Sequence, residues 1–333
     1  MPLSIFRPQG SLSPAEALEL AQQAPELLRK NPKAFSASPF FLLFSAPETT
    51  ELWTSYENLI IACLRTGKDN EAKQFLERLV LRFGGKDERV EALKGLVREA
   101  QATSDAELSA ILKEYEDLLT ENDTNIASIR GWGCEPIAKR RIALLRSMGK
   151  TAEAIEALGS VLDFSPTDGE AWMELGDLYL SQGLYLQAIY SIEEALVLVP
   201  NAWNLHARAG EVLMMAAEAS TEVAPQKYLA ESLKRFCRSI ELCEDYLRGY
   251  YGLKLVTDRI LDGMGKTKKQ TESDGFALPD QSTLEKLNVV AITKLTEMVR
   301  RYEGKEKLWQ GYDAGEMAAA KALLAKSSAK VVR

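Results

Sequence analysis

The chain has 333 residues, of which 46% are apolar and 27% are charged, a profile typical of a folded protein that buries a sizeable core. Its net charge of −7 argues against a phosphate-binding surface over the whole chain, and therefore against a general nucleic-acid binder. The longest apolar runs, residues 40–44 and 59–64, are far shorter than the ~20 residues that a membrane span needs, so we predict a soluble protein.

The first 52 residues are predicted to form N-terminal capping helices. They lack the basic segment followed by an apolar run that marks a secretory signal. Residues 13–30 are predicted to form a helix, because Ser13 and Glu16 have the spacing of a capping box.

Residues 169–202 carry the clearest pattern in the chain. Large and small residues recur there at fixed spacing, and a proline closes the segment: Trp172, Leu175, Gly176, Tyr179, Ala188, Ala195 and Pro200. At an offset of 34 residues, Gly149, Ala154 and Pro166 match Gly183, Ala188 and Pro200. Two proline stops and two turn glycines at one offset indicate a repeated unit.

Weaker copies extend the repeat over residues 53–261. Tyr56, Leu59, Ile60 and Cys63 reproduce the spacing of the first-helix positions, and His206, Ala209, Gly210 and Leu213 do so again. We therefore predict units at about 53–86, 87–124, 135–168, 169–202 and 203–246, with a last unit from 247.

This pattern resembles the tetratricopeptide repeat, a helix pair of 34 residues. Gly176 and Ala188 are small enough to let two antiparallel helices approach closely, and Pro200 lacks the backbone donor needed to continue the second helix. Trp172, Tyr179 and Ile192 are predicted to fill the space between neighbouring pairs, so that Trp172→Ala would cost ~3–5 kcal/mol. The resemblance implies an all-α fold, a right-handed superhelical solenoid of tetratricopeptide-like helix pairs.

Outside the regular units the sequence predicts two interruptions and a helical end. Residues 127–136 read as an insertion broken by Gly131, Gly133 and Pro136, and the polar residues 262–281 as a flexible loop. Residues 282–333 are predicted to form C-terminal helices and a tail. The first helix would cover 282–302, with one apolar face of Leu284, Leu287, Val290, Leu295 and Val299.

Catalytic chemistry finds little support, and we predict neither an enzyme nor a bound cofactor or metal. The four cysteines, Cys63, Cys134, Cys237 and Cys243, form no CxxC pair, and their usage fits a reducing compartment. Cys134 has no histidine available as its base, since the single histidine, His206, falls at a packing position of the repeat. Residues 264–270 contain the letters GKT but do not form a P-loop motif. That motif needs a glycine five residues before Gly265, where this chain has isoleucine.

Basic residues in two first helices are the candidates for partner binding. Lys139, Arg140 and Arg146 lie on one predicted helix, where they either form an ordinary exposed surface or contact an acidic partner. Lys139 and Arg208 also match positions of the carboxylate clamp that some tetratricopeptide proteins use for the acidic tails of heat-shock proteins. Ala143, Glu174 and Asn204 depart from that clamp, and Glu174 would repel a carboxylate.

Residues 50–260 also resemble a more specific family, subunit 2 of the ER membrane protein complex. Segments such as ERVEALKGLVREAQ, IAKRRIALLRSMGKTAEAIEAL and YLAESLKRFCRSIELCEDYLRGYYGL carry this likeness. It implies a non-catalytic scaffold, peripheral on the cytoplasmic side of the endoplasmic reticulum, that binds membrane-embedded and soluble subunits and supports insertion of tail-anchored and multi-pass proteins. The alternative is a free tetratricopeptide cochaperone or assembly adaptor that binds acidic peptide tails.

Overall fold

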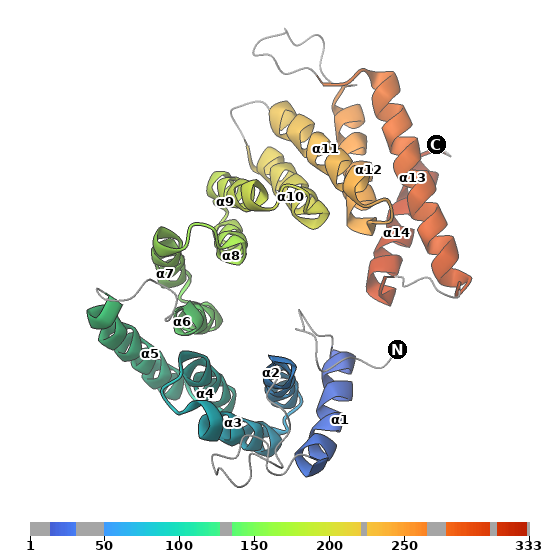
Figure 1. Ribbon diagram of the computed structural model, residues 1–333. Helices are drawn as coiled ribbons and strands as arrows, with labels where there is room; N and C mark the ends of the chain where they lie inside the picture. The colour runs from blue at the N-terminus through green and yellow to red at the C-terminus, as the bar shows by residue number, and fades with distance from the viewer. Residues whose placement is uncertain are drawn as a thin grey trace. The chain divides into compact units, whose positions relative to one another are not determined.

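The computed structural model describes residues 14–30, 50–126, 135–220, 225–264, 278–306 and 312–331. These ranges contain helices and no strand (Figure 1). In chain order the helices are α1 (Pro14–Lys30), α2 (Thr50–Arg65), α3 (Asp69–Phe83), α4 (Glu88–Gln101), α5 (Asp105–Ile126), α6 (Glu135–Ser147), α7 (Thr151–Phe164), α8 (Gly169–Ser181), α9 (Tyr185–Leu198), α10 (Trp203–Ala219), α11 (Pro225–Leu242), α12 (Leu247–Met264), α13 (Gln281–Glu303) and α14 (Ala314–Val331).

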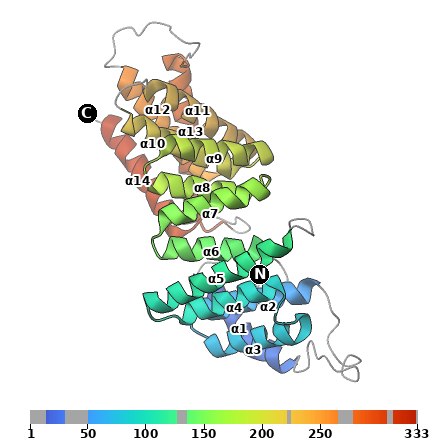
Figure 2. The same cartoon turned by 90° about the vertical axis from the view of Figure 1, so that its left-hand side faces the viewer.

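The helices divide into two compact units, one over Met1–Phe164 and one over Ser165–Arg333. Within the first unit, α2/α3, α4/α5 and α6/α7 are consecutive antiparallel pairs, and α1 packs against α2 and α3. Within the second, α8/α9, α10/α11 and α12/α13 are pairs, and Figure 2 shows α8, α9 and α10 in succession. The predicted all-α fold of tetratricopeptide-like helix pairs is confirmed in each unit.

Three of the pairs turn through the same glycine-based connection. Gly67, Gly149 and Gly183 have φ of 72°, 75° and 71°, a conformation that only glycine adopts without strain. The residue after each glycine donates its N–H to a carbonyl five residues earlier, at 2.8, 2.9 and 2.9 Å, which ends the first helix in a Schellman motif. Gly149 and Gly183 are the glycines predicted to lie in turns.

Aspartates begin the first helix of two pairs. The Asp87 carboxylate accepts from the backbone N–H groups of Arg89 and Val90, at 3.1 and 3.2 Å. Asp168 accepts from Glu170 and Ala171 at 3.0 and 3.1 Å. Each side chain satisfies donors that a helix start leaves unpaired, so these residues fix where α4 and α8 begin.

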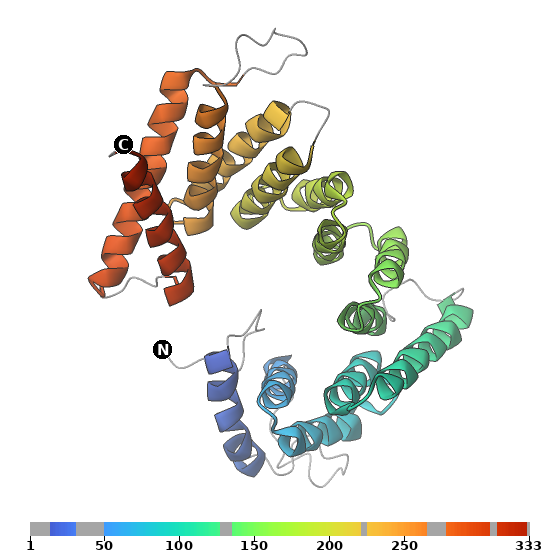
Figure 3. The same ribbon diagram turned by 180° about the vertical axis from the view of Figure 1, so that it is seen from behind.

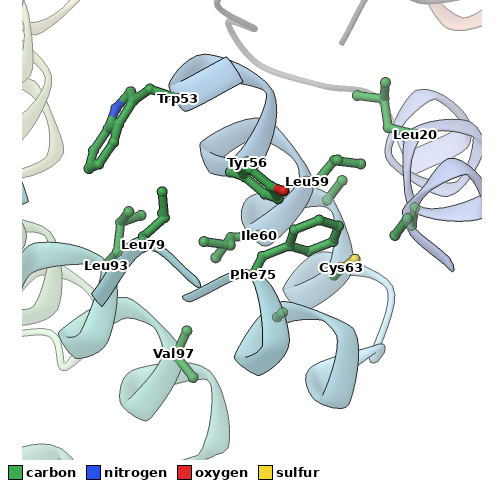
Figure 4. Packing of buried hydrophobic residues seen from close by; sticks show 14 of the residues in the cluster. Leu20, Trp53, Tyr56, Leu59, Ile60, Cys63, Phe75, Leu79, Leu93 and Val97 are labelled. Atoms are coloured by element: carbon green, nitrogen blue, oxygen red, sulfur yellow. The ribbon is translucent and has the colours of Figure 1, made fainter. Parts of the chain in front are cut away.

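The core of the first unit surrounds one aromatic pair (Figure 4). Tyr56 of α2 and Phe75 of α3 are both fully buried, with ring centroids 5.0 Å apart. Leu20 of α1 closes one side of this cluster, and Leu93 and Val97 of α4 close the other. Apolar side chains from four helices thus bury each other, as stacked repeats require.

Polar contacts also hold α1 in place. Arg78 of α3 donates to the Leu28 carbonyl at 3.0 Å and to the Tyr56 hydroxyl at 3.2 Å. Lys68 donates to the Ala21 carbonyl at 3.0 Å. These bonds add to the packing of α1 against α2 and α3. Ser13, predicted to start this helix, lies outside the described residues.

In the second unit, small residues meet large ones where helices cross. A Cβ added to Gly176 of α8 would lie 3.5 Å from the Ala188 carbonyl and 3.3 Å from Ile192 of α9, which is buried. Leu175 and Ala195 are also buried on these two helices. Phe236 of α11 is fully buried against Gly210 of α10 and Gly252 of α12. The close helix approach predicted at Gly176 and Ala188 is therefore present.

Trp172 differs from its predicted role. Its ring is only half-buried: the indole N–H donates to the Pro166 carbonyl at 2.9 Å, and the ring meets Tyr190 edge-on at 6.0 Å. The side chain therefore braces the turn before α8, whereas the fully buried aromatic at the matching position of the first pair is Tyr56.

The cost of removing Trp172 should be correspondingly small. We expect Trp172→Ala to lower the free energy of unfolding by about 1–2 kcal/mol, in the ordinary range for a partly buried site and below the ~3–5 kcal/mol predicted from sequence. Chemical denaturation of the two proteins measures this difference. A loss as large as that for Tyr56→Ala would contradict the observed burial.

Several predicted boundaries shift in the structure. Pro136 does not break a helix; it is the second residue of α6, a position that tolerates proline because its N–H would be unpaired anyway. The expected loop 262–281 is shorter at both described edges, since α12 runs to Met264 and Asp280 caps α13. Val290 was wrongly placed on the apolar face: it is 45% exposed, and Ala291 is buried instead.

The C-terminal helices complete the second unit. Figure 3 shows α14 lying along α13, and buried Met317 and Ala320 of α14 pack with Leu295 and Met298 of α13. The Tyr312 hydroxyl accepts from the Leu247 N–H at 2.9 Å, which ties this end to the start of α12. In the part of the chain that the structure describes, no helix is both long and apolar enough to cross a membrane.

Candidate partner-binding surface

The basic residues singled out in the sequence lie on α6 and α10, and their surroundings differ. Arg146 is exposed in the last turn of α6, where positive charge complements the helix dipole. Lys139 is half-buried earlier on the same helix. Arg140 and Arg208 form ion pairs with carboxylates of neighbouring helices. The four candidates therefore do not form one exposed basic cluster.

Arg140 belongs to a polar network between helix pairs. Its guanidinium pairs with Glu99 of α4, whose side chain is only 12% exposed, and the Tyr115 hydroxyl of α5 donates to the same carboxylate at 2.5 Å. Burial, followed by the bond to Glu99, raises the pKa of Tyr115, so this hydroxyl stays protonated and keeps donating. Arg140 therefore joins α4, α5 and α6, and its charge serves the fold.

Loss of this pairing should destabilise the first unit. We expect Arg140→Ala to lower the free energy of unfolding by about 1–3 kcal/mol, because it leaves the Glu99 carboxylate largely buried with fewer partners. Lys113→Ala on α5, where the side chain is exposed, is the control and should change stability by less than about 0.5 kcal/mol. Thermal denaturation distinguishes the two, and equal effects would mean that Glu99 gains nothing from Arg140.

Arg208 has a similar role in the second unit. Its guanidinium donates to Asp177 of α8 at 2.8 Å and to Glu211 on its own helix at 3.0 Å. Burial opposes the charged form, but the bonds to these carboxylates outweigh it and raise the pKa of Arg208. The pairing joins the first helices of two successive pairs. Together with Glu174 at an asparagine position, it argues against the carboxylate clamp.

A cavity of about 490 Å³ lies between α10 and α12. Apolar and charged side chains line it: Met214, Glu218, Leu255, Asp258, Arg259, Asp262 and Gly263. Arg259 pairs with Glu218 across it, and Asp258 and Asp262 add two further carboxylates to the lining. The repeat pattern does not predict this cavity, because its lining comes from two helices about 40 residues apart.

The sequence analysis also did not predict a buried cation beside this cavity, Lys254. Lys254 of α12 is 2% exposed, and its ammonium pairs with Asp258 one turn further on. Asn288 of α13 donates to both Asp258 and Thr257, each at 2.8 Å. The sequence does contain a signal for this buried ion pair: Lys254 lies between Leu253 and Leu255, and an aspartate follows it at i+4.

The described histidine and the two cysteines with shifted pKa lie in surroundings that favour a packing role over a catalytic one. The His206 ring is 7% exposed with Nε2 2.9 Å from the Pro200 carbonyl oxygen, and burial lowers its pKa. Burial raises the pKa of Cys63 and of Cys237 to about 11, which keeps both thiols in the less nucleophilic protonated form. Cys134 lies outside the described residues. Within those residues no three His, Cys, Asp or Glu side chains could hold a metal ion together.

Comparisons with known proteins agree with the helix-pair architecture. The family described as the EMC2 TPR-like repeat domain matches residues 90–225. The TPR repeat protein oca3 of Schizosaccharomyces pombe is 34% identical over 250 residues, which cover 73% of this chain and 82% of oca3. ER membrane protein complex subunit 2 of Xenopus tropicalis is 31% identical over 184 residues, covering 55% of this chain and 57% of that protein.

The match to Xenopus subunit 2 thus spans little more than half the length of that relative. Among solved structures, the C-terminal part of a TPR repeat-containing protein from Cytophaga hutchinsonii aligns with a TM-score of 0.47 and 12% identity. That alignment covers 92% of this chain and 99% of the Cytophaga chain.

Proposed function

Because the chain belongs to the tetratricopeptide-repeat family that includes oca3 and subunit 2 of the ER membrane protein complex, we propose that it is a scaffold subunit of that complex. The observation that carries the proposal is the family match over residues 90–225, which extends through α10. The family resemblance further implies a peripheral position on the cytoplasmic side of the endoplasmic reticulum, in support of the insertion of tail-anchored and multi-pass proteins.

The packing of the helix pairs supports a scaffold role. Arg140–Glu99 joins the first helices of two consecutive pairs in one unit, and Arg208–Asp177 does so in the other. Such contacts hold side chains in place before a partner arrives, which lowers the entropy that binding must overcome. The protonated thiols and buried histidine favour a non-catalytic subunit over an enzyme.

Lys139 and Arg146 remain the proposed contact with an acidic surface of a neighbouring subunit. Arg140 and Arg208 pair with carboxylates of neighbouring helices, so replacing them would disturb the fold as well as any contact. Charge reversal at Lys139 and Arg146 together should weaken co-purification of partner subunits while helical content stays normal. Unchanged recovery of every partner would exclude these two residues as a contact.

Detergent-extracted membranes offer the direct test of the proposed function. A tag on this chain should recover a fixed set of membrane-spanning subunits together with other subunits of the complex. Recovery mainly of heat-shock proteins would instead support the free cochaperone or adaptor, and would overturn the scaffold assignment.

A further inference from the structure

One face of α9 exposes a line of large apolar side chains. Leu186, Tyr190 and Val197 are 65%, 57% and 74% exposed. They are spaced by four and seven residues, so they lie one above another along the helix, over about 16 Å. We call these three residues the α9 stripe.

The fold of the second unit does not need the α9 stripe. Ala188, Ile192, Ala195 and Leu196 form the buried side of α9, and Ile192 and Leu196 cluster with Ala209 and Val212 of α10. Single exposed apolar residues are common on protein surfaces, but three aligned on one helix indicate a contact surface. Trp172 of α8 packs edge-on against Tyr190 and widens this apolar surface.

The charged side chains that α8 and α9 themselves carry are all acidic. Residues 169–202 contain five carboxylates and no lysine or arginine. Glu193 lies within the stripe, between Tyr190 and Val197, with 46% of its side chain exposed, and Glu194 borders it. Arg235 of α11 orients Glu193 at 2.9 Å, and a carboxylate can accept further hydrogen bonds from a second cation.

We infer that the α9 stripe binds an amphipathic helix of a partner protein that carries lysine or arginine beside its apolar face. The length and straightness of the stripe fit about three turns of a helix, and the carboxylates fit basic side chains next to its apolar residues. This surface goes beyond the proposed scaffold function, because its apolar and acidic side chains are the same whichever complex the chain joins.

Two other occupants suit the surface less well. A second copy of the chain, packed stripe to stripe, would bring Glu193 and Glu194 of both copies together, and like charges in an interface lower affinity. An anionic membrane surface would likewise repel the carboxylates of α8 and α9. A basic helix satisfies both the apolar and the acidic parts of the surface.

The purified full chain can be tested with a defined probe. The probe is a fluorescein-labelled peptide of about five helical turns with leucines along one face and lysines beside them. A matched peptide carries glutamate in place of each lysine. Fluorescence anisotropy should show binding of the lysine peptide that weakens as salt rises, and affinity for the glutamate peptide should be at least about tenfold lower.

Variants of the chain locate the binding site. Leu186→Ser combined with Val197→Ser should weaken lysine-peptide binding by about tenfold or more, because two apolar contacts are lost, while circular dichroism stays unchanged. Val289→Ser is the control, since Val289 is also exposed, at 61%, but lies on α13. Glu194→Gln should weaken binding more modestly and reduce its dependence on salt.

Three outcomes would overturn the inference. The first is equal binding of the two peptides, or equal affinity of the Leu186/Val197 and Val289 variants. The second is a concentration-dependent dimer in sedimentation that the Leu186/Val197 variant abolishes, which would make a second copy the occupant. The third is binding to anionic vesicles that depends on the same two residues. Each result is independent of whether the chain joins the ER membrane protein complex.

Discussion

Phe236→Ala is expected to lower the free energy of unfolding of the second unit by about 3–5 kcal/mol, as large truncations in a packed core do. The Phe236 ring of α11 is fully buried. It fills the space that two glycines leave open: a Cβ on Gly210 of α10 would lie 2.9 Å from the ring, and a Cβ on Gly252 of α12 would lie 2.0 Å from it. Chemical denaturation of the full chain, followed by circular dichroism, measures the loss.

Gly252→Ala adds volume at the same place where Phe236→Ala removes it. We expect it to lower the free energy of unfolding by about 1–3 kcal/mol, because the added methyl group overlaps the Phe236 ring. Combining it with Phe236→Leu should cost less than the sum of the two single changes, since the smaller side chain makes room. Gly159→Ala in α7 is the control. Its Cβ would meet no atom within 4 Å, and alanine should stabilise that helix by about 0.5–1 kcal/mol. Equal effects at Gly252 and Gly159 would contradict the packing of α11 against α12.

Asp258→Asn is the second substitution expected to have a large effect, a loss of about 3 kcal/mol, because it leaves the buried Lys254 ammonium without its anion. Lys254 is 2% exposed, so water cannot replace the lost partner. Asn288, which donates to Asp258 and Thr257, also loses a charged acceptor. Thermal unfolding should show the loss without a change in helical content at low temperature.

Lys254→Met is the matched control for that prediction. Methionine has a similar length and no charge, so this change should cost far less than Asp258→Asn, and the double variant should recover most of the stability. An Asp258→Asn protein as stable as the original would mean that the ammonium finds another partner. A double variant no better than Asp258→Asn would point to the loss of the Asn288 contact instead.

The features that the sequence predicted best are those that depend on residues close together in the sequence. Gly149 and Gly183 lie in turns because only glycine adopts their backbone conformation without strain, and this requirement is local. Gly176 and Ala188 meet where α8 crosses α9 because the repeat fixes the spacing of both positions. The same reasoning predicted a separate C-terminal helix, observed as α13.

Features that depend on distant contacts were not predictable in this way. Arg140 was proposed for a partner, but its carboxylate partner, Glu99, lies 41 residues away in the sequence. The repeat pattern predicts a large residue at position 172, but it does not determine how much of the Trp172 side chain is buried by neighbouring helices. Val290 fits the helical spacing of apolar residues as well as Ala291 does. The residues that α13 buries are nevertheless Leu284, Ala291, Leu295 and Met298.

Native mass spectrometry of the complex purified through this chain tests the central claim most directly. The scaffold assignment predicts one particle in which a single 37.0 kDa copy of the chain accompanies membrane-spanning subunits in a fixed ratio, and this particle should persist after detergent exchange. A chain that is released alone, or that is found only with heat-shock proteins in varying ratio, would contradict the assignment.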